Sequence, residues 1–205
     1  MNKYFLVILF LGAFLFSFAQ EEEKYVPETN PLVLKKIEQW QNLKFGLLMH
    51  WGTYSQWGIV ESWSICPEEY EWCERTEGSN PGDFFAYKQE YENLKKTFNP
   101  VQFNPERWAQ AAKDAGMKYV VFTTKHHDGF CMFDTKYTDY KITDSECPFS
   151  TNPKSNITKE ILNAFRDQGL WAGVYFSKPD WYSPYYWDPK YPPRDRNVNY
   201  EPEAY

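Results

Sequence analysis

The chain has 205 residues, of which 42% are hydrophobic, and it carries a net charge of −6 at pH 7. This length suits one domain with a real core, but it falls short of the ~250 residues typical of a closed eight-stranded α/β barrel. The acidic balance and the scattered Lys and Arg residues exclude a nucleic-acid partner, because phosphate backbones require clustered positive charge. Aromatic residues make up 20% of the chain. Rings in this number serve core packing, and they also favour a carbohydrate site, where they cover the apolar faces of a sugar.

The first residues are typical of a signal peptide. Lys3 precedes an apolar run over residues 4–18, and Ser17-Phe18-Ala19 offers a small-x-small cleavage site. The run is too short to span a bilayer comfortably. We therefore expect residues 1–20 to be removed and the protein to be exported to the periplasm or the extracellular space. We expect no stable membrane insertion after this cleavage.

The mature chain has four cysteines: Cys66, Cys73, Cys131 and Cys147. An oxidising compartment permits disulfides, and Cys66 and Cys73 could close a short loop. Free, partly buried thiols are the alternative. The spacing of the four residues does not resemble a zinc site.

The first elements follow a polar lead-in. Leu34, Ile37 and Trp40 recur at helical spacing and predict a helix over residues 31–43. Residues 45–51 are apolar nearly throughout, which predicts a strand covered on both faces. The segment over residues 52–83 is long for a loop in a compact domain, and loops of this length are usually functional.

The rest of the chain alternates helices and strands. We expect helices over residues 84–98, 104–116 and 155–168, and strands over residues 118–124 and 170–176. Asn104 is a plausible N-cap, while Gly116 and Gly169 suit helix ends. The resulting order of strands and helices predicts a parallel sheet with right-handed crossovers. Residues 178–205 show no clear element.

Scarce polar residues follow each expected strand. The chain has only three histidines. His50 follows the first strand, His126-His127-Asp128 follows the second, and Tyr175 with Ser177 ends the third. Because the carboxyl ends of parallel strands meet at one edge of a sheet, we expect these side chains to converge on one pocket.

Three interpretations of the histidines compete. His50, His126, His127 and Asp128 could bind a metal ion, but successive strand residues point to opposite faces and no His-x-His pair exists, so we expect no metal. They could be core or turn histidines with backbone partners. They could instead bind sugar hydroxyls, since a neutral imidazole offers one donor and one acceptor. The placement of all three at strand ends favours the sugar interpretation.

Several motifs resemble those of glycoside hydrolase family 29, the retaining α-L-fucosidases. In chain order they are Lys44-Phe45-Gly46-Leu47-Leu48-Met49-His50-Trp51-Gly52-Thr53-Tyr54-Ser55, Phe103-Asn104-Pro105-Glu106-Arg107-Trp108, Ala112-Lys113-Asp114-Ala115-Gly116-Met117-Lys118-Tyr119, Thr123-Thr124-Lys125-His126-His127-Asp128-Gly129-Phe130, and Gly173-Val174-Tyr175-Phe176-Ser177 with Asp180-Trp181. The resemblance covers residues 32–181.

The resemblance implies a (β/α)8 TIM-like barrel and an exo-acting enzyme on fucosylated glycans or glycoconjugates, without a cofactor. Carried over by position, His50, His126, His127 and Tyr175 would line the fucose pocket. Glu61 and Trp63 sit where the family has a sugar-contacting Glu-Trp pair, although Ser62 separates them here. Packing of the loop is the alternative role for Trp63.

The catalytic carboxylates are expected outside this sequence. Retaining hydrolysis needs two carboxylates about 5–5.5 Å apart. The family has its Asp nucleophile in a Trp-x-Asp segment on the strand after the one that carries Tyr175, and its acid/base further on. Residues 31–205 are therefore expected to be an incomplete, N-terminal portion of the α/β barrel, with the nucleophile and acid/base beyond Tyr205. The alternative is an inactive, truncated, secreted carbohydrate-binding remnant.

Overall fold

The structure is a computed structural model that describes residues 26–66 and 74–183. The chain divides into two compact units, residues 1–42 and 43–205. The first contains all but the last residue of helix α2 (Pro31–Leu43), which has the predicted bounds and no buried residue. The signal peptide predicted over residues 1–20 and the tail beyond residue 183 lie outside the described residues.

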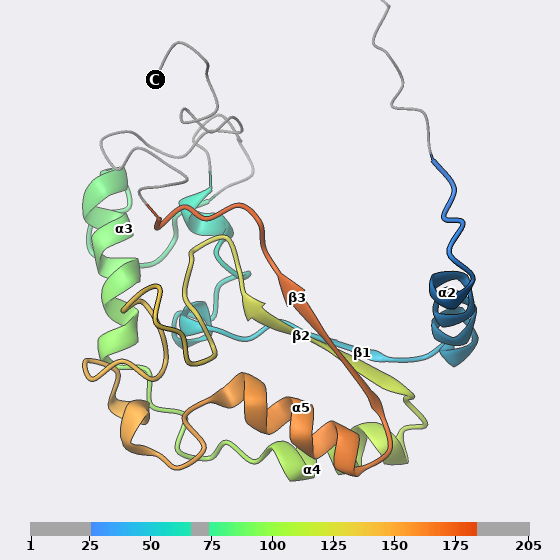
Figure 1. Ribbon diagram of the computed structural model, residues 1–205. Coiled ribbons are helices and arrows are strands. Elements are labelled where there is room, and N and C mark those ends of the chain that lie inside the picture. Colours follow the sequence, from blue (N-terminus) through green and yellow to red (C-terminus); the bar gives the residue numbers. More distant parts are fainter. Residues whose placement is uncertain (1–25, 67–73, 184–205) are drawn as a thin grey trace, which may run out of the picture. The chain divides into compact units, whose positions relative to one another are not determined.

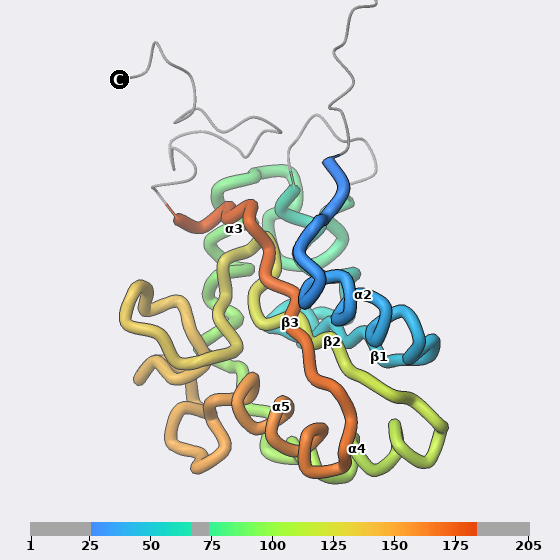
Figure 2. Tube along the Cα trace, turned by 45° about the vertical axis from the view of Figure 1, so that its right-hand side comes forward, coloured from blue at the N-terminus to red at the C-terminus, as the bar shows by residue number. Residues whose placement is uncertain are grey.

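The second unit is built on a sheet of three strands that is parallel, as the sequence predicted, and has the order β1-β2-β3. The strands are β1 (Leu47–Met49), β2 (Tyr119–Lys125) and β3 (Trp171–Phe176). Helices α4 (Pro105–Asp114) and α5 (Ile157–Asp167) lie side by side on one face of the sheet, as Figures 1 and 2 show. The carboxyl ends of all three strands consequently point to the same edge.

The N-cap of α4 and the glycines that end α4 and α5 are those that the sequence indicated. The Asn104 side chain accepts a hydrogen bond from Arg107 N (2.9 Å), and Asn156 does the same for Lys159 N. Gly116 and Gly169 follow the two helices with φ of +85° and +77°. Only glycine adopts this left-handed backbone at no steric cost, so both helices end there.

The main core lies between the sheet and these two helices. Val120 and Phe122 of β2 and Ile161 and Phe165 of α5 are fully buried. The flanking residues Leu47 and Met49 of β1 pack against this core.

The prediction for the first strand was wrong in two respects. It spans residues 47–49 rather than 45–51, and it is not covered on both faces, since Leu48 is 61% exposed. Alternation along the strand turns Leu48 away from the helix layer that its neighbours contact.

A second cluster of buried residues fixes the long loop. The loop contains two short 3-10 helices, η1 (Thr53–Gln56) and η2 (Trp63–Ile65). Helix α3 follows over Phe84–Asn93, shorter than predicted, and continues as η3 (Leu94–Lys96); a fourth 3-10 helix, η4 (Pro148–Thr151), precedes α5. Tyr54 and Ile65 pack with Tyr87 and Tyr91 of α3 and with Trp181 beyond β3. This packing holds the loop beside the ends of the strands.

Cys66 is disulfide-bonded, whereas Cys131 and Cys147 are free and buried. Cys73, the predicted partner of Cys66, lies outside the described residues. Within residues 26–66 and 74–183, no helix is both long and apolar enough to cross a membrane.

Replacing the α4 cap should measurably destabilise the protein. Asn104→Ala is expected to lower the free energy of unfolding by about 1 kcal/mol, because it leaves a helix N–H without its acceptor, while Asn104→Asp keeps the bond. Urea denaturation of both variants, with Asn99→Ala in an exposed loop as the control, measures this. Equal stability of Asn104→Ala and the wild type would contradict the assignment.

Candidate functional site

All six residues that the sequence singled out come together at the carboxyl edge of the sheet. His50 follows β1, His126 and His127 follow β2, and Tyr175 lies near the end of β3. The ring of His50 lies 5.6 Å from that of His126 and 5.8 Å from that of Tyr175. The long loop adds Glu61 and Trp63.

The carboxylate of Glu61 joins three of these side chains. Its Oε2 accepts a hydrogen bond from Trp63 Nε1 (2.8 Å) and lies 3.0 Å from His126 Nε2. Its Oε1 lies 2.7 Å from His50 Nδ1, a close electrostatic contact that lacks the alignment of a hydrogen bond. Glu61 has φ of +51°. That left-handed backbone costs about 1–2 kcal/mol for a non-glycine residue, which is typical of functional sites.

The two adjacent histidines both reach the site because β2 ends before them. The pairing of β2 with β3 becomes irregular between Thr123 and Lys125, and the strand stops at Lys125. The His126 and His127 rings then lie 4.4 Å apart. Side chains alternate between the two faces along a strand, which argued against both histidines pointing the same way. Because the strand has ended, that argument does not apply at these positions.

Each of these rings is held through its Nδ1 atom by a serine. Ser62 Oγ lies 2.5 Å from Nδ1 of the buried His126. Ser177 Oγ contacts Nδ1 of the half-buried His127. The Trp63 ring makes T-shaped contacts with both imidazoles, with ring centres 5.4 and 4.8 Å away.

Both histidines are neutral at ordinary pH. Burial, with the nearby charges of His127, His50 and Lys125, lowers the pKa of His126 to about 3. Burial and the charges of Lys125 and His50 lower the pKa of His127 to about 4. Neutral imidazoles offer both a hydrogen-bond donor and an acceptor, which suits hydroxyl groups.

Aromatic rings complete the walls of the site. Tyr175 stacks on His126 at 6.2 Å, and Trp181 lies 4.9 Å from His127. Trp181 also meets Trp63 at 6.1 Å. Polar rings and flat apolar faces in one place are the arrangement expected of a carbohydrate pocket.

Asp128 has a different role from its histidine neighbours. Its fully buried carboxylate accepts hydrogen bonds from Tyr91 of α3 (2.8 Å) and from Phe130 N (3.3 Å). Gly129 follows with φ of +81°, and a Cβ atom there would lie 2.6 Å from Asp180. Asp128 therefore ties the turn after β2 to α3 and is no part of the site's hydrogen-bonding surface.

Among the described residues, His50, Glu61 and His126 are the one set whose ligand atoms could hold a metal ion, all lying within 4.8 Å of one another. Two ligands of a tetrahedral zinc ion lie about 3.3 Å apart. The contacts of Glu61 with the two rings are shorter, at 2.7 and 3.0 Å. The carboxylate thus pairs with the rings directly, and neither His127 nor Asp128 belongs to the set.

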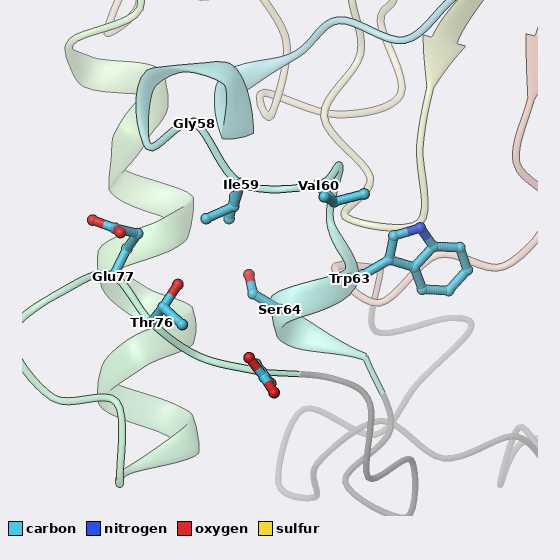
Figure 3. Close-up of a pocket in the computed structure, with 8 residues that line it drawn as sticks. Gly58, Ile59, Val60, Trp63, Ser64, Thr76 and Glu77 are labelled. Atoms are coloured by element: carbon cyan, nitrogen blue, oxygen red, sulfur yellow. The ribbon is translucent and has the colours of Figure 1, made fainter.

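A cavity of about 480 Å³ adjoins the site along the loop. Trp63 stands at its edge, while Ile59, Ser64 and Thr76 reach toward it, as Figure 3 shows. Glu74 and Glu77 give it an acidic rim. The same tryptophan therefore borders both the histidine cluster and a second cavity.

Sequence reasoning missed Ser62 as a functional residue. It treated Ser62 only as an interruption between Glu61 and Trp63, and nothing in the pattern marked it as a partner of His126. It noted Ser177 only for its place at the end of a strand, a signal that pointed to the pocket but not to His127.

Comparison with known proteins gives consistent matches. The family model for Alpha-L-fucosidase matches residues 13–205. Tissue alpha-L-fucosidase of Homo sapiens is 31% identical over 189 residues, which cover 88% of this chain and 38% of that protein.

Solved structures of fucosidases also resemble this one. Alpha-L-fucosidase isoenzyme 1 from Paenibacillus thiaminolyticus has a TM-score of 0.55 at 38% identity, covering 73% of this chain and 30% of that chain. A GH29 alpha-L-fucosidase from Bacteroides thetaiotaomicron, a trapped covalent intermediate in complex with 2-fluoro-fucosyl fluoride, has a TM-score of 0.54 at 30% identity, covering 74% and 32%. The chain spans only 16–38% of the length of the first curated relatives that it matches.

The buried Asp128 should give the protein a pH-dependent stability. Burial raises its pKa from 3.8 to about 6. Between about pH 4 and pH 6 the folded protein keeps a proton on Asp128 that the unfolded chain releases. The contribution of Asp128 to the free energy of unfolding therefore falls as pH rises through this range. The loss amounts to as much as about 3 kcal/mol.

Urea denaturation between pH 4 and 7 tests this contribution. Asp128→Asn, which cannot titrate, should lack that part of the slope, whereas Asp167→Asn at an exposed position should keep it. Parallel curves for the wild type and Asp128→Asn would contradict the raised pKa.

Proposed function

The chain belongs to the alpha-L-fucosidase family, and we propose that the protein is an exo-acting, retaining α-L-fucosidase that removes terminal L-fucose from glycans or glycoconjugates. The observation that carries this proposal is the meeting of His50, Glu61 and His126 within 4.8 Å at the carboxyl edge of the sheet. Such an edge is where α/β enzymes bind their substrates.

The pocket's chemistry suits a terminal 6-deoxy sugar. Neutral His126 and His127, the Glu61 carboxylate and the Tyr175 hydroxyl offer donors and acceptors for the fucose hydroxyls. The rings of Trp63 and the neighbouring aromatic residues offer an apolar wall for the methyl group. His126 is buried, with its side chain 2% exposed, so it forms a floor against which a chain-end sugar can rest.

The two catalytic carboxylates are proposed to lie beyond Tyr205, on strands that continue the sheet into a (β/α)8 barrel. In the described part of the chain, Glu61 is the carboxylate that contacts the pocket's histidines, and it is already paired with Trp63, His126 and His50. A carboxylate so engaged suits binding better than nucleophilic attack. The covalent intermediate trapped in the Bacteroides relative supports a retaining mechanism.

Export is proposed from two observations. Residues 4–18 are apolar after a basic start, as in a signal peptide. Cys66 is disulfide-bonded, which is usual in the periplasm or outside the cell and rare in the cytosol. Mass spectrometry of the mature protein should find its N-terminus near Gln20 or Glu21, and an intact Met1 start on exported material would contradict cleavage.

The full-length protein should hydrolyse an aryl α-L-fucoside with retention of configuration, which proton NMR of the first-formed fucose detects. Glu61→Gln is expected to lower kcat/KM about 10- to 100-fold, because hydrogen bonds to a charged group contribute about 1.5–3 kcal/mol. Glu106→Gln is the matched control, since the same change falls on an exposed carboxylate that pairs with Lys154.

The outcomes separate the two candidate roles. Retaining turnover that Glu61→Gln impairs and Glu106→Gln leaves intact supports the enzyme. Measured binding of L-fucose without turnover of any α-L-fucoside points to the carbohydrate-binding alternative. Neither binding nor turnover by the full-length protein would overturn the proposal.

A further inference from the structure

Ser177 has a hydrogen-bond arrangement that determines where the proton of His127 sits. The Ser177 hydroxyl donates to the carbonyl oxygen of Pro179 (2.9 Å). A hydroxyl has one proton, and a carbonyl oxygen can only accept. The Ser177 oxygen is therefore left as an acceptor toward His127 Nδ1, which it also contacts. His127 must carry its proton on Nδ1 for that contact to be a hydrogen bond.

The other nitrogen of this ring is then a free acceptor. Burial and nearby positive charge keep His127 neutral, with its pKa lowered to about 4. A neutral imidazole with a proton on Nδ1 has only a lone pair on Nε2. Within residues 26–66 and 74–183, His127 Nε2 makes no hydrogen bond. The His127 ring is half-buried between Trp63 and Trp181. Packing against these two rings fixes the direction in which the Nε2 lone pair points.

His126 is held in the opposite way. Its Nε2 lies 3.0 Å from the Glu61 carboxylate, which can only accept, so a proton on Nε2 is favoured. Its Nδ1 then accepts from the hydroxyl of Ser62 at 2.5 Å. Ser62, unlike Ser177, makes no second hydrogen bond through its hydroxyl to another described residue, so its proton is available for this bond.

We propose that Ser177 is a positioning residue that holds His127 with its proton on Nδ1 and its Nε2 as a hydrogen-bond acceptor, while Ser62 and Glu61 hold the adjacent His126 in the opposite tautomer. The two neighbouring imidazoles thus carry their protons on opposite ring nitrogens. His127 presents an acceptor at Nε2, whereas His126 carries its proton at Nε2. His127 requires a ligand hydroxyl that donates. This last step rests on the proposed sugar site, whereas the two tautomers do not.

The polarity has a consequence for specificity. A fluorine atom in place of a hydroxyl can accept weakly but cannot donate. At the fucose hydroxyl that meets His127, a deoxyfluoro derivative should therefore bind no better than the deoxy derivative. At a hydroxyl that accepts from the protein, fluorine should recover part of the lost affinity.

The direct test is long-range 15N–1H NMR on the ligand-free, full-length protein near pH 7. Histidine signals are assigned through His50→Gln, His126→Gln and His127→Gln. His127 should show a protonated Nδ1 and an unprotonated Nε2, and His126 the reverse. A protonated Nε2 on His127, or a rapid mixture of both tautomers, would overturn the proposal whether or not the protein proves to be a fucosidase.

Variants test the role of Ser177 itself. Ser177→Ala should remove the tautomer preference of His127 and weaken L-fucose binding about 3- to 10-fold, the effect of one neutral hydrogen bond. Ser177→Thr, which keeps a hydroxyl, should restore both. Ser150→Ala, remote from the site, is the control. An unchanged His127 tautomer in Ser177→Ala would overturn the role of Ser177, and if that variant fails to fold, the wild-type spectrum alone decides.

L-fucose binding to the wild type distinguishes the inference from the proposed function. The expected tautomers without fucose binding would uphold the arrangement of Ser177 and His127 and count against the fucosidase. Fucose binding together with a protonated His127 Nε2 would support the fucosidase and overturn the arrangement of Ser177 and His127.

Discussion

The carboxylate of Glu61 is the contact on which the site depends. It faces His50 after β1, His126 after β2 and Trp63 in the loop, at 2.7 to 3.0 Å from a nitrogen of each. One side chain of the loop thus joins the end of β1 to the end of β2, which lie 76 residues apart at His50 and His126. The left-handed backbone at Glu61 is a cost of this arrangement. A single carboxylate can contact three partners only if the loop that carries it is held in place. The aromatic cluster around α3 holds that loop.

The parallel sheet supplies the other half of the geometry. Because the three strands run in the same direction with α4 and α5 on one face, residues that follow each strand meet at one edge. Asp128, buried beneath that edge and bonded to Tyr91, fixes the turn that presents His126 and His127. The result is a floor of neutral imidazoles bordered by aromatic rings, the surface on which the proposed sugar would rest.

Local sequence patterns were sufficient to predict the parallel sheet and to place the histidines and Tyr175 near the ends of its strands, whereas Glu61 and Trp63 came from the family resemblance. Asn104, Gly116 and Gly169 marked helix ends correctly because capping depends on neighbouring residues alone. The bounds of β1 were wrong, since an apolar run does not say which of its faces the helices cover. The serine partners of the histidines could not be predicted, because Ser62 is 64 residues from His126 and Ser177 is 50 from His127. Such pairings are set by tertiary packing.

A crystal structure of the full-length protein with L-fucose tests the central claim most directly. The account predicts one fucose at the carboxyl edge of the sheet, with its hydroxyls within hydrogen-bond distance of His126, His127 and Glu61. Its methyl group should lie against an aromatic ring. Fucose bound elsewhere, with the imidazoles and Glu61 paired only to one another as they are here, would contradict the account.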